Sequence, residues 1–339
     1  MERSHVTVSA RIFAALVEAG RAAGVTMEPL LARLGIDPAC FEDPDARLPL
    51  SAEDALWEAT AEASGDPCFG LHAAAHLRSD DFDVFGYALR TSATLGDALR
   101  NAARYNRLLH DVAEIALVED GDTVRVTHRF RGDPTGATPQ AADYTMAALV
   151  TTARMLTGTG VRPEGVTLMH PPPADERAYR EVFGEGVSLA FGAPRNEVVF
   201  HHDVLERPVV SGDPGLHAVL RRHADALLAD LPAADDLPTR VRELVAEGLR
   251  GGDPSLEAIA SRLGQSPRTL QRRLSDHGVR FSEMVDEMRH ALARTYLDDP
   301  RLAIGEVAYL LGFSEPRAFH RALKRWTGTT PAAWREDRG

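Results

Sequence analysis

Two short groups of polar residues near the C-terminus share residue types and spacing. In each group the spacing is i, i+3 and i+4, which puts three side chains on one face of a helix. Arginine can donate two hydrogen bonds to guanine, and glutamine can bond adenine in the same bidentate way. Both groups therefore suit contacts to base edges in a major groove. The residues are Arg268, Gln271 and Arg272 in the first group, and Arg317, His320 and Arg321 in the second.

Residues beside these groups suit contacts to a phosphate backbone. Arg273, Lys324 and Arg325 lie off the base-reading face, and side chains that bind phosphates set register without reading sequence. Ser266 and Ser314 precede the two groups, where a serine oxygen can accept the free amides of a helix N-terminus. We expect phosphate contacts from all five residues.

Each group belongs to a pattern that is written twice between residues 255 and 335. The copies are offset by 48 residues up to the serine and by 49 after it. Each begins with apolar residues spaced as on one helix face. Each then passes through Gly264 or Gly312, and glycine suits the left-handed residue that ends a helix. Each copy therefore predicts a helix-turn-helix, whose second helix is backed by Leu270 and Leu274, or by Phe319 and Leu323.

A long amphipathic helix is predicted between the copies, over residues 281–297. It would hold the two reading helices at a fixed distance, and successive grooves on one face of DNA are ~34 Å apart. For one copy alone, a charged helix with a solvated polar face is an equally good interpretation. The repetition of the same polar triplet at the same place favours DNA reading.

The second copy resembles the signature of AraC-type transcription regulators. The matching residues run from Gly312 to Gly328 and continue from Thr330 to Arg335. The resemblance covers about the last 85 residues of the chain. It implies an all-α domain over 253–339, with two helix-turn-helix motifs joined by a linker helix, that reads double-stranded promoter DNA.

The charge of the chain is unevenly distributed. The net charge of −12 would disfavour a polyanionic partner if it were spread evenly. Residues 254–339 instead hold 14 Lys and Arg against 11 Asp and Glu, a net charge of +3, and residues 1–253 carry −15. This modest excess predicts that affinity for DNA depends on shape and specific contacts, although salt should still weaken it.

The sequence contains no motif for catalysis, a metal or a cofactor. Cys40 and Cys68 do not make a disulfide framework or a metal motif. A Gly-x-Ser-x-Gly elbow, a phosphate loop and a paired-cysteine zinc motif are absent from the sequence. His72 and His76 have the i, i+4 spacing of metal ligands but lack the accompanying glutamate and a third ligand, so we interpret them as structural or surface residues.

Neither a membrane span nor a signal peptide is recognisable. No apolar run reaches the ~18 residues of a spanning helix, and the first residues lack a basic segment followed by an apolar core. We expect a cytoplasmic protein that is not an enzyme and has no membrane partner.

The first 232 residues predict an α+β domain, helical in front and mixed behind, and residues 233–252 predict a linker with a lead-in helix. Ser51 is expected to cap one of the front helices. Asp120-Gly121-Asp122 is expected to turn a β-hairpin. The expected helices fall within 8–35, 51–64, 68–77, 83–109, 141–157, 174–183, 214–231 and 238–250, and the expected strands are 112–118, 123–130, 166–169 and 198–200.

This front part resembles the arabinose-binding-like N-terminal domain of AraC-type regulators similar to ornithine-utilisation activators. The matching motifs are Leu34-Gly35-Ile36-Asp37-Pro38, Gly65-Asp66-Pro67, Gly86-Tyr87-Ala88-Leu89, Arg104-Tyr105 and Phe191-Gly192-Ala193-Pro194. The resemblance implies binding of a small-molecule effector or dimerisation, and does not imply arabinose.

Several polar and aromatic residues of the front domain are candidates for an effector pocket, which needs a few convergent polar groups among apolar walls. The sequence does not rank them. Its arginines would suit a carboxylate such as an amino acid or a fatty acid. The candidates are Tyr87, Arg90, Arg104, Tyr105, Arg107, His110 and Tyr144.

The predicted helix over 214–231 is amphipathic and either caps the front domain or forms the seam of a homodimer. RNA polymerase is a further expected partner if the protein activates transcription. Two other interpretations of the front domain remain open. It is either a purely structural part of a constitutive DNA-binding dimer, or it carries an unrecognised enzymatic activity.

Overall fold

The computed structural model describes residues 6–78, 81–131, 137–231, 237–249, 254–276, 279–299, 301–313 and 315–336. The chain divides into two compact units, one made of residues 3–129 and 137–232, the other of residues 1–2, 130–136 and 233–339. No helix within the described ranges is both long and apolar enough to cross a lipid bilayer.

A five-stranded sheet in the order β3-β4-β7-β5-β6 forms the centre of the first unit. β4 pairs antiparallel with β7, where Val126 lies opposite Val198, and β5 pairs parallel with β6. Gly121, with φ of 59°, lies in the turn between β3 and β4, as the Asp-Gly-Asp sequence predicts. The strands are β3 (Ala113–Asp120), β4 (Thr123–Phe130), β5 (Gly165–Thr167), β6 (Ser188–Ala190) and β7 (Asn196–His201).

Helices make up most of the rest of this unit, and a two-stranded ribbon of β1 (Thr7–Ser9) and β2 (Arg47–Pro49) accompanies them. The helices are α1 (Ala10–Ala22), α2 (Met27–Leu34), α3 (Leu50–Ser64), α4 (Phe69–Ala73), α5 (Asp83–Arg90), α6 (Leu95–Tyr105), α7 (Pro139–Thr157), α8 (Arg177–Phe183) and α9 (Pro214–Asp230). Short 3₁₀ turns cover Pro38–Glu42, Ala74–His76, Asn106–Leu108 and His202–Glu206.

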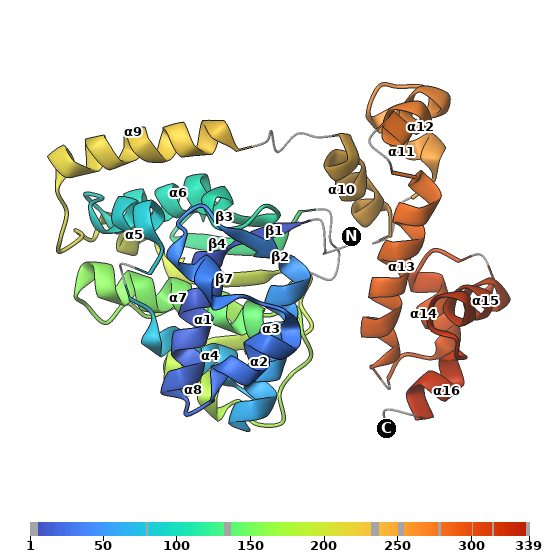
Figure 1. Ribbon diagram of the computed structural model, residues 1–339, viewed down its shortest axis with the longest axis horizontal. Coiled ribbons are helices and arrows are strands. Elements are labelled where there is room, and N and C mark those ends of the chain that lie inside the picture. Colours follow the sequence, from blue (N-terminus) through green and yellow to red (C-terminus); the bar gives the residue numbers. More distant parts are fainter. Residues whose placement is uncertain are drawn as a thin grey trace. The chain divides into compact units, whose positions relative to one another are not determined.

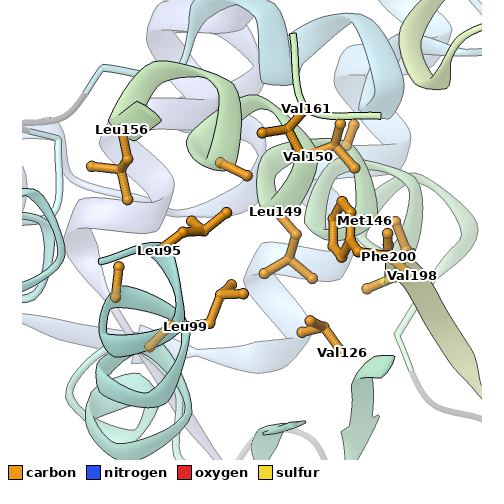
Figure 2. Packing of buried hydrophobic residues seen from close by; sticks show 14 of the residues in the cluster. Leu95, Leu99, Val126, Met146, Leu149, Val150, Leu156, Val161, Val198 and Phe200 are labelled. Carbon is orange, nitrogen blue, oxygen red and sulfur yellow. The ribbon is translucent and has the colours of Figure 1, made fainter. Parts of the chain in front are cut away.

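The core of the first unit lies where α6 and α7 meet the sheet. Met146 and Val150 of α7 are fully buried with Val126 and Val198 of the strands. Figure 2 shows these side chains together with Leu149, which points toward α6. Because an α-helix has 3.6 residues per turn, the apolar residues of α7 form one side that packs on the sheet and a neighbouring side that packs on α6.

The mixed helix and strand content of this unit agrees with the sequence prediction, but two details were wrong. α3 begins at Leu50 after Pro49, and no side chain caps it, so Ser51 is not its N-cap. Glu53 is buried instead, and accepts a hydrogen bond from the indole nitrogen of Trp57 at 3.2 Å. The strands β1, β2 and β6 were also missed.

From residue 237 onward, the described residues of the second unit form helices joined by short turns. Figure 1 shows α11 and α12 near one end of α13, and α14, α15 and α16 toward the other end. Its core includes Val241 and Val245 of α10, so the lead-in helix is packed into this unit. The helices are α10 (Leu237–Leu249), α11 (Leu256–Arg262), α12 (Pro267–Asp276), α13 (Phe281–Leu297), α14 (Ile304–Leu310), α15 (Pro316–Thr327) and α16 (Pro331–Glu336).

Candidate DNA interface and ligand cavity

α12 is a short helix with one buried side and one cationic side. Pro267 occupies its first turn, and Ser266 accepts a hydrogen bond from the backbone amide of Thr269 at 3.2 Å, as expected of an N-cap. Leu270 and Leu274 are 0% exposed and fix the orientation of the helix. The opposite side is therefore left to solvent. Its exposed residues are Arg268, Gln271, Arg272 and Arg273.

α15 repeats this arrangement after a turn with one extra residue. Pro316 occupies its first turn, and Phe319 and Leu323 are 0% exposed. Its N-cap residue is Glu315, and Ser314, which the sequence predicts as the cap, lies outside the described residues. The exposed residues are Arg317, His320, Arg321, Lys324 and Arg325.

The cationic side chains on these two faces differ in how they are held. Arg268, Arg272 and Arg321 form no ion pair with any described residue, so their guanidinium groups are available to a polyanion. Arg325 is instead ion-paired with Asp286 of α13 and lies 6.0 Å from the ring centre of Trp326. Arg325 thus ties α15 to α13.

Arg289 of α13 fixes the turn that precedes α15. Its guanidinium donates to the carbonyl oxygens of Leu311 at 3.0 Å and Gly312 at 3.2 Å, and lies 4.6 Å from the ring centre of Phe313. Gly312 has φ of 72°, a conformation that suits glycine. Burial lowers the pKa of Arg289, with Asp286 opposing the shift. The start of α15 is therefore positioned by α13.

A long helix, α13, connects α12 to α14. α13 contains 17 residues, which correspond to ~25 Å at the rise of an α-helix. Its bounds, Phe281–Leu297, coincide with the prediction from the apolar pattern. Met284 and Leu292, two turns apart along it, are both buried in the core of this unit.

A cavity of about 290 Å³ lies in the first unit between α5, α6 and α7. Its walls are mainly aliphatic and aromatic, with a few polar groups. In Figure 2, Leu95 and Leu99 of α6 point toward Leu149 of α7, and all three line this cavity. Arg90 and Tyr144 are the two predicted effector residues among its lining residues.

The other five predicted effector residues do not line this cavity. Arg104 forms an ion pair with Asp225 of α9 at 2.8 Å, and the Tyr105 hydroxyl donates to the same carboxylate at 2.8 Å. Burial and this hydrogen bond raise the pKa of Tyr105 to about 12. Tyr87 is exposed, with the Arg90 guanidinium 5.1 Å from its ring centre.

His110 and Arg107 are the remaining two predicted effector residues that do not line the cavity. His110 is buried, and its Nδ1 accepts from the backbone amide of Ala113 at 3.1 Å. Its Nε2 lies 3.6 Å from Glu53 Oε2. Arg107 is half-buried in the 3₁₀ turn after α6. The prediction from the sequence therefore overlooked the apolar wall residues of the cavity, whose spacing is that of any core-facing helix.

A second cavity, of about 540 Å³, is lined by polar residues that already bond one another. Asp143 accepts from the Tyr179 hydroxyl at 2.7 Å and lies 2.9 Å from His170 Nε2. His170 Nδ1 lies 2.8 Å from the carbonyl oxygen of Pro171, so both ring nitrogens face oxygen acceptors. Burial alone would lower the pKa of His170, but Asp143 and this carbonyl outweigh it and raise the pKa. These groups hold the fold together and leave few donors for a ligand.

Comparison with known proteins identifies both parts of the chain. Residues 24–209 match the family described as the arabinose-binding domain of AraC transcription regulator, N-terminal, and residues 259–337 match a helix-turn-helix domain family. The ornithine utilization regulator of Pseudomonas aeruginosa is 34% identical over 92% of this chain and 91% of its own length. The chain belongs to the AraC-type transcription regulators. It is a DNA-binding regulator of transcription with a front domain of the effector-binding class.

Other AraC-type regulators match over nearly the whole chain. The HTH-type transcriptional regulator VirS of Mycobacterium tuberculosis is 31% identical over 93% of this chain and 92% of its own length. The crystal structure of the transcriptional regulator CdpR from Pseudomonas aeruginosa matches 96% of this chain and 98% of its own, with 27% identity and a TM-score of 0.44.

Proposed function

We propose that this regulator reads promoter DNA through two helix-turn-helix motifs, α11–α12 and α14–α15, with α12 and α15 in successive major grooves. The observation that carries the proposal is the duplicated face. Each helix begins with proline, has two fully buried apolar residues one turn apart, and exposes two arginines and one further polar residue at matching positions on its other side. A helix backed in this way can enter a groove without losing its packing.

We assign each candidate residue to a base or to a phosphate according to the face of the helix on which it lies. Base edges are contacted by Arg268, Gln271 and Arg272 of α12 and by Arg317, His320 and Arg321 of α15. Phosphates are contacted by Arg273, Lys324 and the two serines, Ser266 and Ser314. Arg325 reaches a phosphate while it remains beside Asp286, because a carboxylate and a phosphate can share the donors of one guanidinium.

We further propose that a small molecule bound in the 290 Å³ cavity controls DNA binding. An effector that binds one arrangement of the front domain better than another shifts the population that binds DNA productively. The cavity gives this mechanism a physical place, which a purely structural front domain would not need. In this scheme residues 1–232 bind the effector and form a homodimer, residues 233–252 lead into the DNA-binding domain over 253–339, and RNA polymerase is a partner at activated promoters.

The name of one relative suggests ornithine as a candidate effector, but the cavity does not favour it. Ornithine carries two ammonium groups and one carboxylate. The charged residues that line the cavity are Arg78 and Arg90, and no Asp or Glu is among its described lining residues. A cationic side chain would therefore be buried beside like charge without a counterion, which costs free energy.

Chromatin immunoprecipitation followed by sequencing tests the DNA-reading proposal. The wild-type chain should enrich promoter fragments that share a two-part motif. The double variant Arg272→Ala and Arg321→Ala should lose this enrichment while it remains folded, because both side chains are exposed and form no ion pair with a described residue. Unchanged enrichment by the double variant would contradict the proposed reading faces.

A further inference from the structure

The ligand cavity of the front domain is elongated along α7. Its lining residues on that helix extend from Tyr144 to Leu156, a separation of ~18 Å along the helix axis. At one end, Val210 donates its amide to the carbonyl of Leu156 at 2.8 Å, and the neighbouring Ser211 donates to the carbonyl of Arg90 at 2.7 Å. Arg90 therefore lies at the Leu156 end, and Tyr144 lies at the opposite end.

The Arg90 end offers a cation without a counterion. Arg90 lines the cavity and is half-buried, and its side chain forms no ion pair or hydrogen bond with any described residue. The Arg90 guanidinium lies 5.1 Å from the centre of the Tyr87 ring. A planar guanidinium binds carboxylates through two parallel hydrogen bonds. This end is therefore suited to an anionic head group.

The middle of the cavity is apolar. Leu95 and Leu99 of α6 face Leu149 of α7 across it, and Phe85 of α5 adds an aromatic wall. Such walls stabilise a ligand by removing apolar surface from water. The volume of about 290 Å³ corresponds to roughly ten water-sized groups. The ligand body should thus be a hydrocarbon of similar size.

Arg78, the other charged residue of the lining, already has a partner within the protein and is not a second free cation. The opposite end of the cavity is formed by Tyr144. Its hydroxyl has no hydrogen-bond partner among the described residues, and its ring lies 5.0 Å from that of Trp57. Burial is the main cause that raises the pKa of this hydroxyl, and the negative charges of Asp81 and Glu53 raise it further. The hydroxyl therefore stays neutral. A neutral aromatic side chain suits the tail of a ligand better than its anionic head group.

From this arrangement we propose that the effector is an elongated, mainly apolar carboxylate of about ten non-hydrogen atoms, with its carboxylate on Arg90 and its tail toward Tyr144. The inference rests on the proposed effector control and narrows it to one chemical class. It also chooses between the two carboxylates expected from the sequence, an amino acid and a fatty acid. An alkyl or aryl acid fits the apolar walls, whereas a zwitterionic amino acid does not.

Isothermal titration of the full chain with octanoate tests the proposal. Octanoate should bind, octanol should bind more weakly, and butanoate should lose most of the affinity that apolar burial supplies. Arg90→Gln should weaken octanoate by about 10-fold to 100-fold and leave octanol unchanged, because it removes only a charged hydrogen-bond partner. Tyr144→Phe should leave octanoate binding the same or slightly tighter.

A matched control separates this site from general cationic attraction. Arg104 is exposed and held by Asp225 outside the cavity, so Arg104→Gln should bind octanoate like the wild type. Equal octanoate affinity in wild type and Arg90→Gln, or equal affinity for octanoate and octanol, would overturn the proposal. Sequence-specific footprints measured on the same preparation tell the two failures apart. If they persist without octanoate binding, the ligand class alone is wrong, and if they are absent, the proposed function fails as well.

Discussion

Replacing Arg272 by alanine should relax base preference at one position of the operator. Arg272 is exposed, and Leu270 and Leu274 hold its helix from the opposite side. Because it forms no ion pair with a described residue, its loss should change stability by no more than ~0.5 kcal/mol. A bidentate arginine–guanine contact is worth ~1–3 kcal/mol of discrimination, which is about 5-fold to 150-fold in Kd.

The neighbouring Arg273 provides a matched control on the same helix. Arg273→Ala removes an equal charge from a side chain that we assign to phosphate. It should weaken all sequences alike and reduce the slope of log K against log salt by ~0.9.

Fluorescence anisotropy at several salt concentrations measures both effects. The DNA would be a duplex selected in vitro with the full chain, together with its single-base variants. The Arg272→Ala protein should bind the selected duplex more weakly than the wild type does, but should retain wild-type affinity for one of the single-base variants of that duplex. If Arg272→Ala and Arg273→Ala weaken every duplex equally, the assignment of a base-reading face on α12 is refuted.

Three further changes test the packing and the electrostatics. Phe319→Ala should destabilise the C-terminal domain by ~3–5 kcal/mol in urea denaturation, since this ring is 0% exposed behind the proposed reading face. An effect below ~1 kcal/mol would contradict its role in packing. Arg289→Lys should preserve the charge, lose the paired bonds to the turn before α15, and weaken specific binding in the same anisotropy assay; wild-type affinity would show that the turn needs no such support. Burial lowers the pKa of His128 to about 3, with a smaller effect of His110. The unfolded chain therefore binds the extra proton first, so stability should fall as pH decreases from about 6.5 toward 3 by ~1.4 kcal/mol per pH unit from this residue, and an equally steep fall in His128→Phe would refute the assignment.

Much of the helical architecture could be predicted because its signals are local. The apolar stripe of residues 281–297 predicts both ends of α13, and Ser266 caps α12 by accepting a hydrogen bond from the amide of Thr269, as the sequence predicts. Strands β1, β2 and β6 have three residues each, too few for a period of two to be recognised. Their existence depends on partners that are distant in the sequence, such as Thr7 opposite Pro49.

The two candidate sites differ in how far the sequence could predict them. The exposed triplets follow from helical geometry, because buried residues at i and i+4 leave the opposite side free. The cavity depends on tertiary packing. Arg104 and Tyr105 look as suitable as Arg90 in the sequence, but Asp225, about 120 residues later, engages both of them. Nothing in the spacing of Leu95 and Leu99 distinguishes a cavity wall from a filled core.

Methylation interference on the selected duplex tests most directly whether the chain reads DNA with two helices. Methyl groups on guanine N7 lie in the major groove, where α12 and α15 are proposed to bind. We predict two interfering clusters on one face of the duplex, about 34 Å or one helical turn apart, with Arg272→Ala removing sensitivity in one cluster and Arg321→Ala in the other. A single cluster that disappears with either variant, or interference that neither variant changes, would contradict the account.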